Sequence, residues 1–138
     1  RAERPRAMGN PRRANGYRRT ALLRRVRGRG EPCWICGHPL DPAVPQGDPL
    51  ALECDELTPV SKGGDPYDPA NVRGAHRCCN NWRGNKDAPI VLAVAAAVRS
   101  LGGSTCPQDF VSKARYVERS VKARARKVGE QSTTTDWL

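Results

Sequence analysis

The chain of 138 residues has the length of one domain, a formal net charge of +10, and only 38% hydrophobic and 5% aromatic residues. Its longest apolar run, residues 90–98, has nine residues, whereas a membrane-spanning helix needs about 20. Since no apolar segment follows the basic start, we expect neither a membrane span nor a secretory signal, and no membrane partner.

The first thirty residues hold eleven Arg and one Glu, which accounts for the whole net charge. Residues 1–16 are rich in Arg, Pro, Gly and Asn, so we expect a disordered basic arm. Residues 17–30 predict a short basic helix, with Leu22, Leu23 and Val26 on one side and glycines at its end. A strongly basic segment of this kind favours a polyanionic partner.

Residues 31–86 are expected to form a small α+β core. A Cys-x-x-Cys turn and a proline-rich loop open it, and residues 50–58 predict a strand. A turn-rich loop over 61–69 leads to a return strand over 71–75, which makes a hairpin. A helix should then begin near residue 76 and continue to about residue 86.

Residues 87–128 predict two further helices. Pro89 suits the first turn of one helix, which two glycines end at 102–103. The last helix should run from about residue 107 to 128, and its second part is basic. Residues 129–138 form a polar tail. Helical spacing predicts these apolar positions on the last helix: Phe110, Ala114, Val117, Val121, Ala125 and Val128.

Two pairs of residues have the spacing of metal ligands, Cys33 with Cys36 and His76 with Cys79. Zinc prefers four tetrahedral nitrogen and sulfur ligands, and residues three apart on a helix share a face. Cys78 would lie about 100° further round that helix. An aromatic-poor core of this size needs a staple. We therefore predict a structural Zn²⁺ held by Cys33, Cys36, His76 and Cys79.

The segment between and after these pairs contains Glu53-Cys-Asp-Glu-Leu-Thr-Pro-Val-Ser-Lys-Gly-Gly64, then Asn71, then His76-Arg-Cys-Cys79-Asn80. In order and spacing it resembles the HNH endonuclease family, specifically its small phage-type members. The resemblance covers about residues 31–86. It implies a ββα-metal core, in which a hairpin and a helix hold one catalytic divalent cation, flanked here by helices and basic terminal arms.

The resemblance assigns roles to four residues of the predicted catalytic site. Asp55 and Asn80 would be ligands of a catalytic Mg²⁺ or Mn²⁺, which prefers oxygen ligands. Asn71 matches the middle asparagine, and its amide can orient a base but cannot act as one. Glu56 stands where the family has its first histidine.

Glu56 leaves three interpretations open. It can be the general base, although a carboxylate with a reference pKa near 4.3 is weaker than an imidazole near 6.5. It can be a second metal ligand beside Asp55, or the substitution can mark an impaired site. Neighbours on a regular strand face opposite sides, so Asp55 and Glu56 share a site only if the strand bends.

The function predicted from these features is a metal-dependent DNA endonuclease of HNH type. Arg77, Arg83 and Lys86 would contact DNA phosphates, while the arm and the last helix would bind the flanking backbone without sequence preference. The resemblance also implies a phage or prophage protein in the bacterial cytoplasm, with terminase or portal as partners. The alternatives are a catalytically impaired zinc-containing nucleic-acid-binding module and a structural assembly protein.

Overall fold

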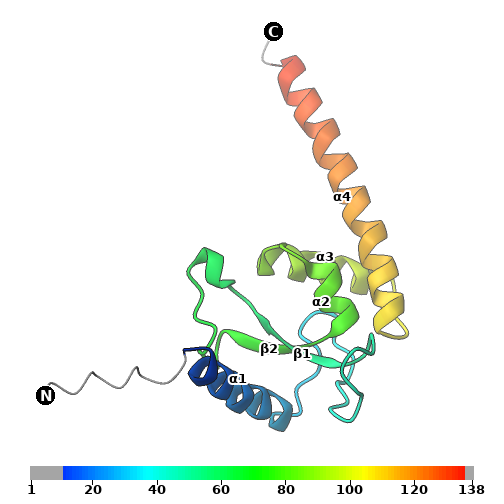
Figure 1. Ribbon diagram of the computed structural model, residues 1–138. Helices are drawn as coiled ribbons and strands as arrows, with labels where there is room; N and C mark the ends of the chain where they lie inside the picture. The colour runs from blue at the N-terminus through cyan, green and yellow to red at the C-terminus, as the bar shows by residue number, and fades with distance from the viewer. Residues whose placement is uncertain (1–10, 136–138) are drawn as a thin grey trace, which may run out of the picture.

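The computed structural model describes residues 11–135, and it confirms an α+β fold (Figure 1). Four helices surround one two-stranded antiparallel sheet in this part of the chain. The elements in chain order are α1 (Pro11–Gly28), β1 (Leu52–Glu56), the short 3-10 helix η1 (Val60–Lys62), β2 (Val72–His76), α2 (Arg77–Arg83), α3 (Ala88–Ser100) and α4 (Pro107–Thr135).

The hairpin pairs β1 with β2 from Leu52 opposite His76 to Glu56 opposite Val72. The loop between the strands depends on its two glycines. Gly63 has a φ of 86°, a left-handed conformation that favours glycine, and a Cβ on Gly64 would clash with the backbone of Thr58. The conformation of the hairpin loop therefore explains why glycine occupies both positions.

One side of the hairpin is covered by α1. Leu22 and Val26 are buried there against Leu52 and Val72, which joins the basic helix to the sheet. The helix begins at Pro11, six residues earlier than predicted, since proline suits the first turn of a helix. Of the predicted disordered arm, residues 11–16 are thus helical, and residues 1–10 lie outside the described residues.

The other side of the hairpin carries a second core, formed by α2, α3, α4 and the Cys33–Cys36 turn. Trp82 and Phe110 meet edge to face in it, with ring centroids 5.8 Å apart. Phe110, Ala114 and Val117 are buried as the helical spacing predicts. The side chains of the remaining predicted positions lie outside what the structure describes: Val121, Ala125 and Val128.

Element boundaries differ from the predictions mainly at the ends. The strand β1 is shorter than predicted, because residues on either side of it bond to α2 and to the loop. The last helix continues to Thr135, past the predicted end at 128, and projects away from the body (Figure 1). Within residues 11–135, none of the helices combines the length and apolarity needed to cross a membrane.

Candidate metal centre and acidic cleft

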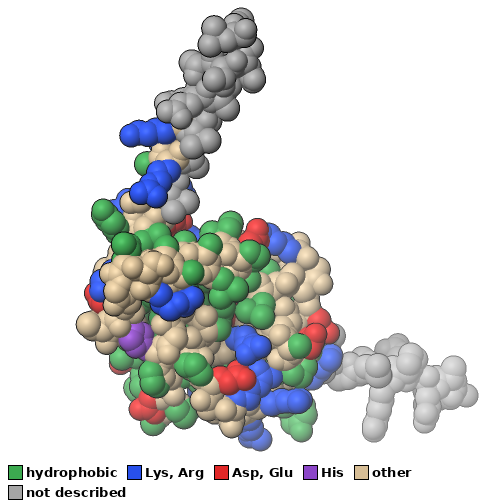
Figure 2. Space-filling model, turned by 180° about the vertical axis from the view of Figure 1, so that it is seen from behind, with side chains coloured by type: hydrophobic (Ala, Val, Ile, Leu, Met, Phe, Trp, Pro, Cys, Tyr) green, Lys and Arg blue, Asp and Glu red, His purple; other side chains and the backbone are tan. Residues whose placement is uncertain are grey.

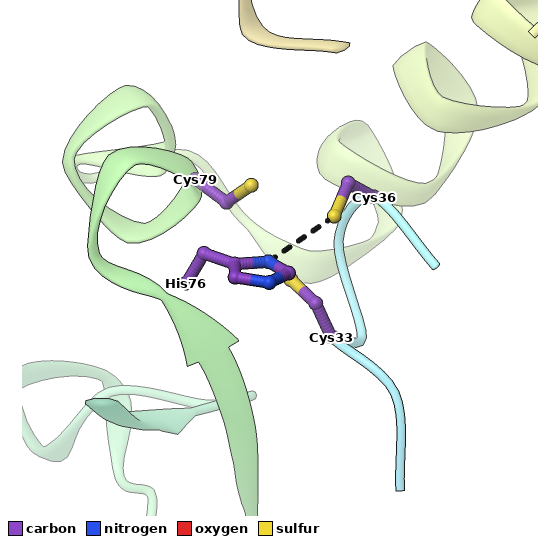
Figure 3. A group of neighbouring side chains, drawn as sticks. All are labelled: Cys33, Cys36, His76 and Cys79. Atoms are coloured by element: carbon purple, nitrogen blue, oxygen red, sulfur yellow. Dashed lines mark hydrogen bonds between the residues drawn. The ribbon is translucent and has the colours of Figure 1, made fainter. Parts of the chain in front are cut away.

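The four predicted zinc ligands come together. The ligand atoms of Cys33, Cys36, His76 and Cys79 all lie within 4.8 Å of one another, and Cys36 Sγ is 3.3 Å from His76 Nδ1. Figure 3 shows the four side chains converging from the turn, the end of β2 and the first turn of α2. The predicted cluster is confirmed as one that can hold a metal ion such as zinc.

Backbone hydrogen bonds fix the turn that carries two of these thiols. The N–H of Gly37 donates to the carbonyl of Cys33 at 2.9 Å, and the N–H of Cys33 donates to the carbonyl of His38 at 3.0 Å. Trp34 donates its N–H to Gly74 of β2 at 3.1 Å. The turn is therefore attached to the strand that delivers His76, so both halves of the cluster are positioned by the same hairpin.

The imidazole of His76 is oriented by a contact outside the cluster. Its Nε2 lies 3.0 Å from the carbonyl oxygen of Pro39, which can only accept a hydrogen bond. Nε2 must therefore carry the proton, and Nδ1 keeps its lone pair toward the thiols. A carbonyl partner behind a ligating histidine is a recurrent feature of metal sites in proteins.

The charges of the cluster also fit a cation. Hydrogen bonding with Cys33 raises the pKa of Cys36 to about 12, while hydrogen bonding with Cys36 and Cys79 lowers the pKa of Cys33. A divalent ion would stabilise all three thiolates, because buried groups of like charge need an opposite charge beside them.

The second histidine and the three remaining cysteines lie outside the cluster. His38 instead has its Nε2 2.9 Å from Ser104 Oγ, which ties the turn to the loop before α4. Cys54, Cys78 and Cys106 are free, half-buried thiols. The spacing argument that chose Cys79 over its neighbour Cys78 is confirmed.

The acidic side chains of β1 divide between the two faces of the hairpin. Glu53 and Asp55 bond to α2, whereas Glu56 pairs with Arg19 of α1. Asp55 Oδ2 accepts hydrogen bonds from Trp34 Nε1 at 2.9 Å and from Arg83 Nη1 at 2.7 Å. Burial raises the pKa of Asp55, and the Arg83 guanidinium opposes that rise.

Asn80 also contacts β1, through Glu53, a residue that was not among those predicted for the site. Its Nδ2 donates to Glu53 Oε2 at 2.9 Å. Asp55 and Asn80 thus lie between the same two elements, β1 and α2, and each is bonded to a different partner. Glu53 fixes the amide so that Asn80 Oδ1 is the atom left for a cation. Strand alternation could have found it, since Glu53 precedes Asp55 by two residues.

Arg83, a predicted phosphate contact, is bonded within the protein. Its side chain is only 2% exposed and donates to Asp55, to the carbonyls of Glu56 and Leu57, and to the carbonyl of Lys86. It also lies over the Trp34 ring, 4.9 Å from its centroid. The predicted phosphate contact stays a prediction, and in this arrangement the end of α2 turns Arg83 into the hairpin, where its guanidinium is engaged by these protein groups.

The other two predicted phosphate contacts, Lys86 and Arg77, have different surroundings. Lys86 Nζ donates to the carbonyl of Trp82 at 2.7 Å and pairs with Glu118 at 3.5 Å, so it joins α2 to α4. Arg77 is half-buried and lines a cleft of about 360 Å³ together with Glu53 and Asn80. Of the three predicted phosphate contacts, Arg77 thus lines the cleft beside Asn80, and Arg83 is bonded to Asp55.

Asn71 and Glu56 meet at the loop that follows β1. Asn71 Oδ1 accepts the N–H of Thr58 at 2.9 Å, and its Nδ2 donates to the carbonyls of Thr58 and Asp65. Glu56 Oε2 accepts the N–H of Val60 at 3.3 Å. Asp55 and Glu56 both line a second cleft, of about 240 Å³. Asn71 therefore holds the loop that positions Glu56.

Comparisons with protein-family models, with curated proteins and with solved structures give no match.

Proposed function

We propose that the protein is a metal-dependent DNA endonuclease of HNH type, stabilised by a structural zinc ion. The observation that carries the proposal is the position of the cysteine–histidine cluster. It joins the turn, β2 and the start of α2, which brings Asp55 and Asn80 onto facing elements. The order of these elements supports the proposal, since the HNH resemblance also implies a hairpin followed by a helix.

In this proposal Asp55 and the Oδ1 atom of Asn80 are the ligands of Mg²⁺ or Mn²⁺. Such a cation would polarise a phosphoryl oxygen and stabilise the leaving oxygen. Arg83 and Trp34 hold Asp55 in position, and Glu53 holds the Asn80 amide. Asn71 keeps the loop in place beside Glu56.

Glu56 is directed toward α1 and Asp55 toward α2, but both line one cleft, which is what a base or a second ligand needs in this proposal. We favour the role of general base, which activates water. The ligand role and the impaired site stay as alternatives. DNA is the proposed partner, and from the resemblance alone we extend the proposal to a phage or prophage protein that works beside terminase or portal.

A second candidate function is a zinc-containing module that binds nucleic acid without cutting it. The ion pair between Asp55 and Arg83 favours this candidate, because a cation at Asp55 must share the carboxylate with a buried guanidinium. The substitution of Glu56 for histidine points the same way.

A plasmid assay tests the proposal. Zinc-loaded protein is incubated with supercoiled plasmid in Mg²⁺, in Mn²⁺, and in EDTA added just before the DNA. We expect nicking with either cation, none with EDTA, and none for Asp55→Ala. Plasmid binding without any nicking, by protein shown to contain zinc, would instead establish the second candidate.

A further inference from the structure

A nuclease site near Asp55 and Asn80 needs a positively charged side chain that is free to contact a phosphate. Arg83 is buried and hydrogen-bonded to the hairpin, and Lys86 joins α2 to α4. Arg19 differs from both. It comes from α1, outside the segment that resembles HNH proteins, and its side chain is 56% exposed.

Arg19 also borders both clefts. It lines the cleft that contains Glu53, Arg77 and Asn80, and it lines the cleft that contains Asp55 and Glu56. A phosphate that approaches the candidate cation ligands from either cleft therefore comes within reach of the same guanidinium.

The backbone that carries Arg19 is well supported. Leu22, one helical turn further along α1, is buried with Val26 against the hairpin. Residues three apart on a helix share a face, so Arg19 lies on the side of α1 that is turned to β1. A long side chain on a packed helix can be aimed accurately, as binding of a substrate group demands.

The present partner of Arg19 is exchangeable. Its Nη1 atom is 3.8 Å from Glu56 Oε1, longer than a good charged hydrogen bond. Exposed pairs of this kind contribute little to stability, whereas a guanidinium binds phosphate oxygens through two parallel hydrogen bonds. On the face seen from behind, Figure 2 shows Lys and Arg side chains gathered next to a few acidic ones.

We propose that Arg19 binds the non-bridging oxygens of the phosphate that is cut, and that this exchange frees Glu56 from its ion pair. The inference rests on the proposed nuclease function and adds a substrate-binding residue to it. Arg19 would take the role that the sequence assigned to Arg83. The helix α1 would then be part of the active site, in addition to covering the hairpin.

The test compares Arg19→Ala with Arg24→Ala in the Mn²⁺-dependent plasmid assay. Arg24 lies on the same helix, is exposed and has the same charge, so it controls for general attraction to DNA. We expect Arg19→Ala to lower kcat/KM by about 100-fold, as loss of a donor to a transition-state oxygen does. Arg24→Ala should change it by less than about threefold, and Arg19→Lys should recover part of the loss. Melting temperatures of all three variants should match the wild type.

The possible results separate the two proposals. If the wild type nicks plasmid and the two alanine variants lose activity equally, the role of Arg19 is wrong and the nuclease function stands. If the wild type nicks and Arg19→Ala alone loses activity, with unchanged melting and partial recovery in Arg19→Lys, the proposal stands. If the wild type fails to nick plasmid at all, both proposals fall together.

Discussion

The metal centre and the acidic cleft are built from neighbouring segments but differ in how their residues are paired. In the metal centre, the four side chains face one another, and the outer nitrogen of His76 has its own carbonyl partner. In the acidic region, Asp55 lines one cleft and Asn80 lines the other, and each bonds to another protein group. The first region can hold one metal ion, whereas the side chains of the second are engaged in a network of protein contacts.

The largest effect should follow removal of the metal, which would disrupt the metal centre. We expect a strong chelator to abolish cooperative melting of the core, because structural zinc contributes about 10–16 kcal/mol to folding of small zinc domains. Cys79→Ala should have the same effect. Circular dichroism melting curves with and without chelator measure it, and Cys106→Ser, outside the cluster, is the control. Identical curves with and without chelator would contradict the structural role of the metal.

The second effect concerns the ion pair in the acidic cleft. Asp55→Ala leaves the buried guanidinium of Arg83 without its carboxylate, and breaking a buried pair in this way costs about 3–5 kcal/mol. Urea denaturation should show this loss. The double variant Asp55→Ala with Arg83→Met should be more stable than Asp55→Ala alone, because no charge is then left unpaired. If the double variant is instead the less stable one, the hydrogen bonds of Arg83 to backbone carbonyls outweigh its pairing with Asp55.

These two regions also differ in how well the sequence predicted them. The four metal ligands were found because their spacing is local: a turn supplies one pair, and a strand end with a helix turn supplies the other. The hairpin and the helix order followed from glycines, prolines and apolar spacing. The protein contacts of Arg83 were not predicted, and Glu53 and Arg19 were not singled out. Their carboxylate or amide partners (Asp55 for Arg83, Asn80 for Glu53 and Glu56 for Arg19) lie 27 or more residues away in the chain, so the direction of each side chain depends on how α1 and α2 pack against β1.

Glu56→His sharpens the comparison, because it tests whether the acidic cleft is arranged for catalysis. We expect the substitution to raise the nicking rate, since an imidazole is a stronger base than a carboxylate near neutral pH. Initial rates in Mn²⁺ at several pH values measure this, with Glu31→His on the protein surface as the control. A lower rate accompanied by weaker Mn²⁺ binding would assign Glu56 to the metal instead.

The next effect is smaller and concerns the orientation of Asn80. Glu53→Ala removes the acceptor that holds the amide, at a cost of about 1 kcal/mol in stability. Because the amide can then turn its nitrogen toward the cation, we expect weaker Mn²⁺ binding with folding largely kept. Calorimetric titration with Mn²⁺ measures this, and Asp48→Ala in the exposed loop before β1 is the control. Unchanged Mn²⁺ affinity would remove Glu53 from the site.

The smallest effect lies outside both regions, at the start of α4. The N–H of Thr105 donates to Asp109 Oδ2 at 2.8 Å and Lys113 Nζ lies 3.0 Å from the same oxygen, and these contacts lower the pKa of Asp109 below its usual 3.8. An acid whose pKa is lower in the folded state stabilises the fold above its unfolded pKa and loses that contribution as the pH falls through its folded pKa. The wild type should therefore melt above Asp109→Asn at pH 7, and the difference should shrink below about pH 5. Acid also protonates the metal-binding thiolates, but it does so in both proteins. The difference between their melting temperatures therefore isolates Asp109. A constant difference from pH 7 to pH 4 would show that the carboxylate charge contributes nothing at this helix end.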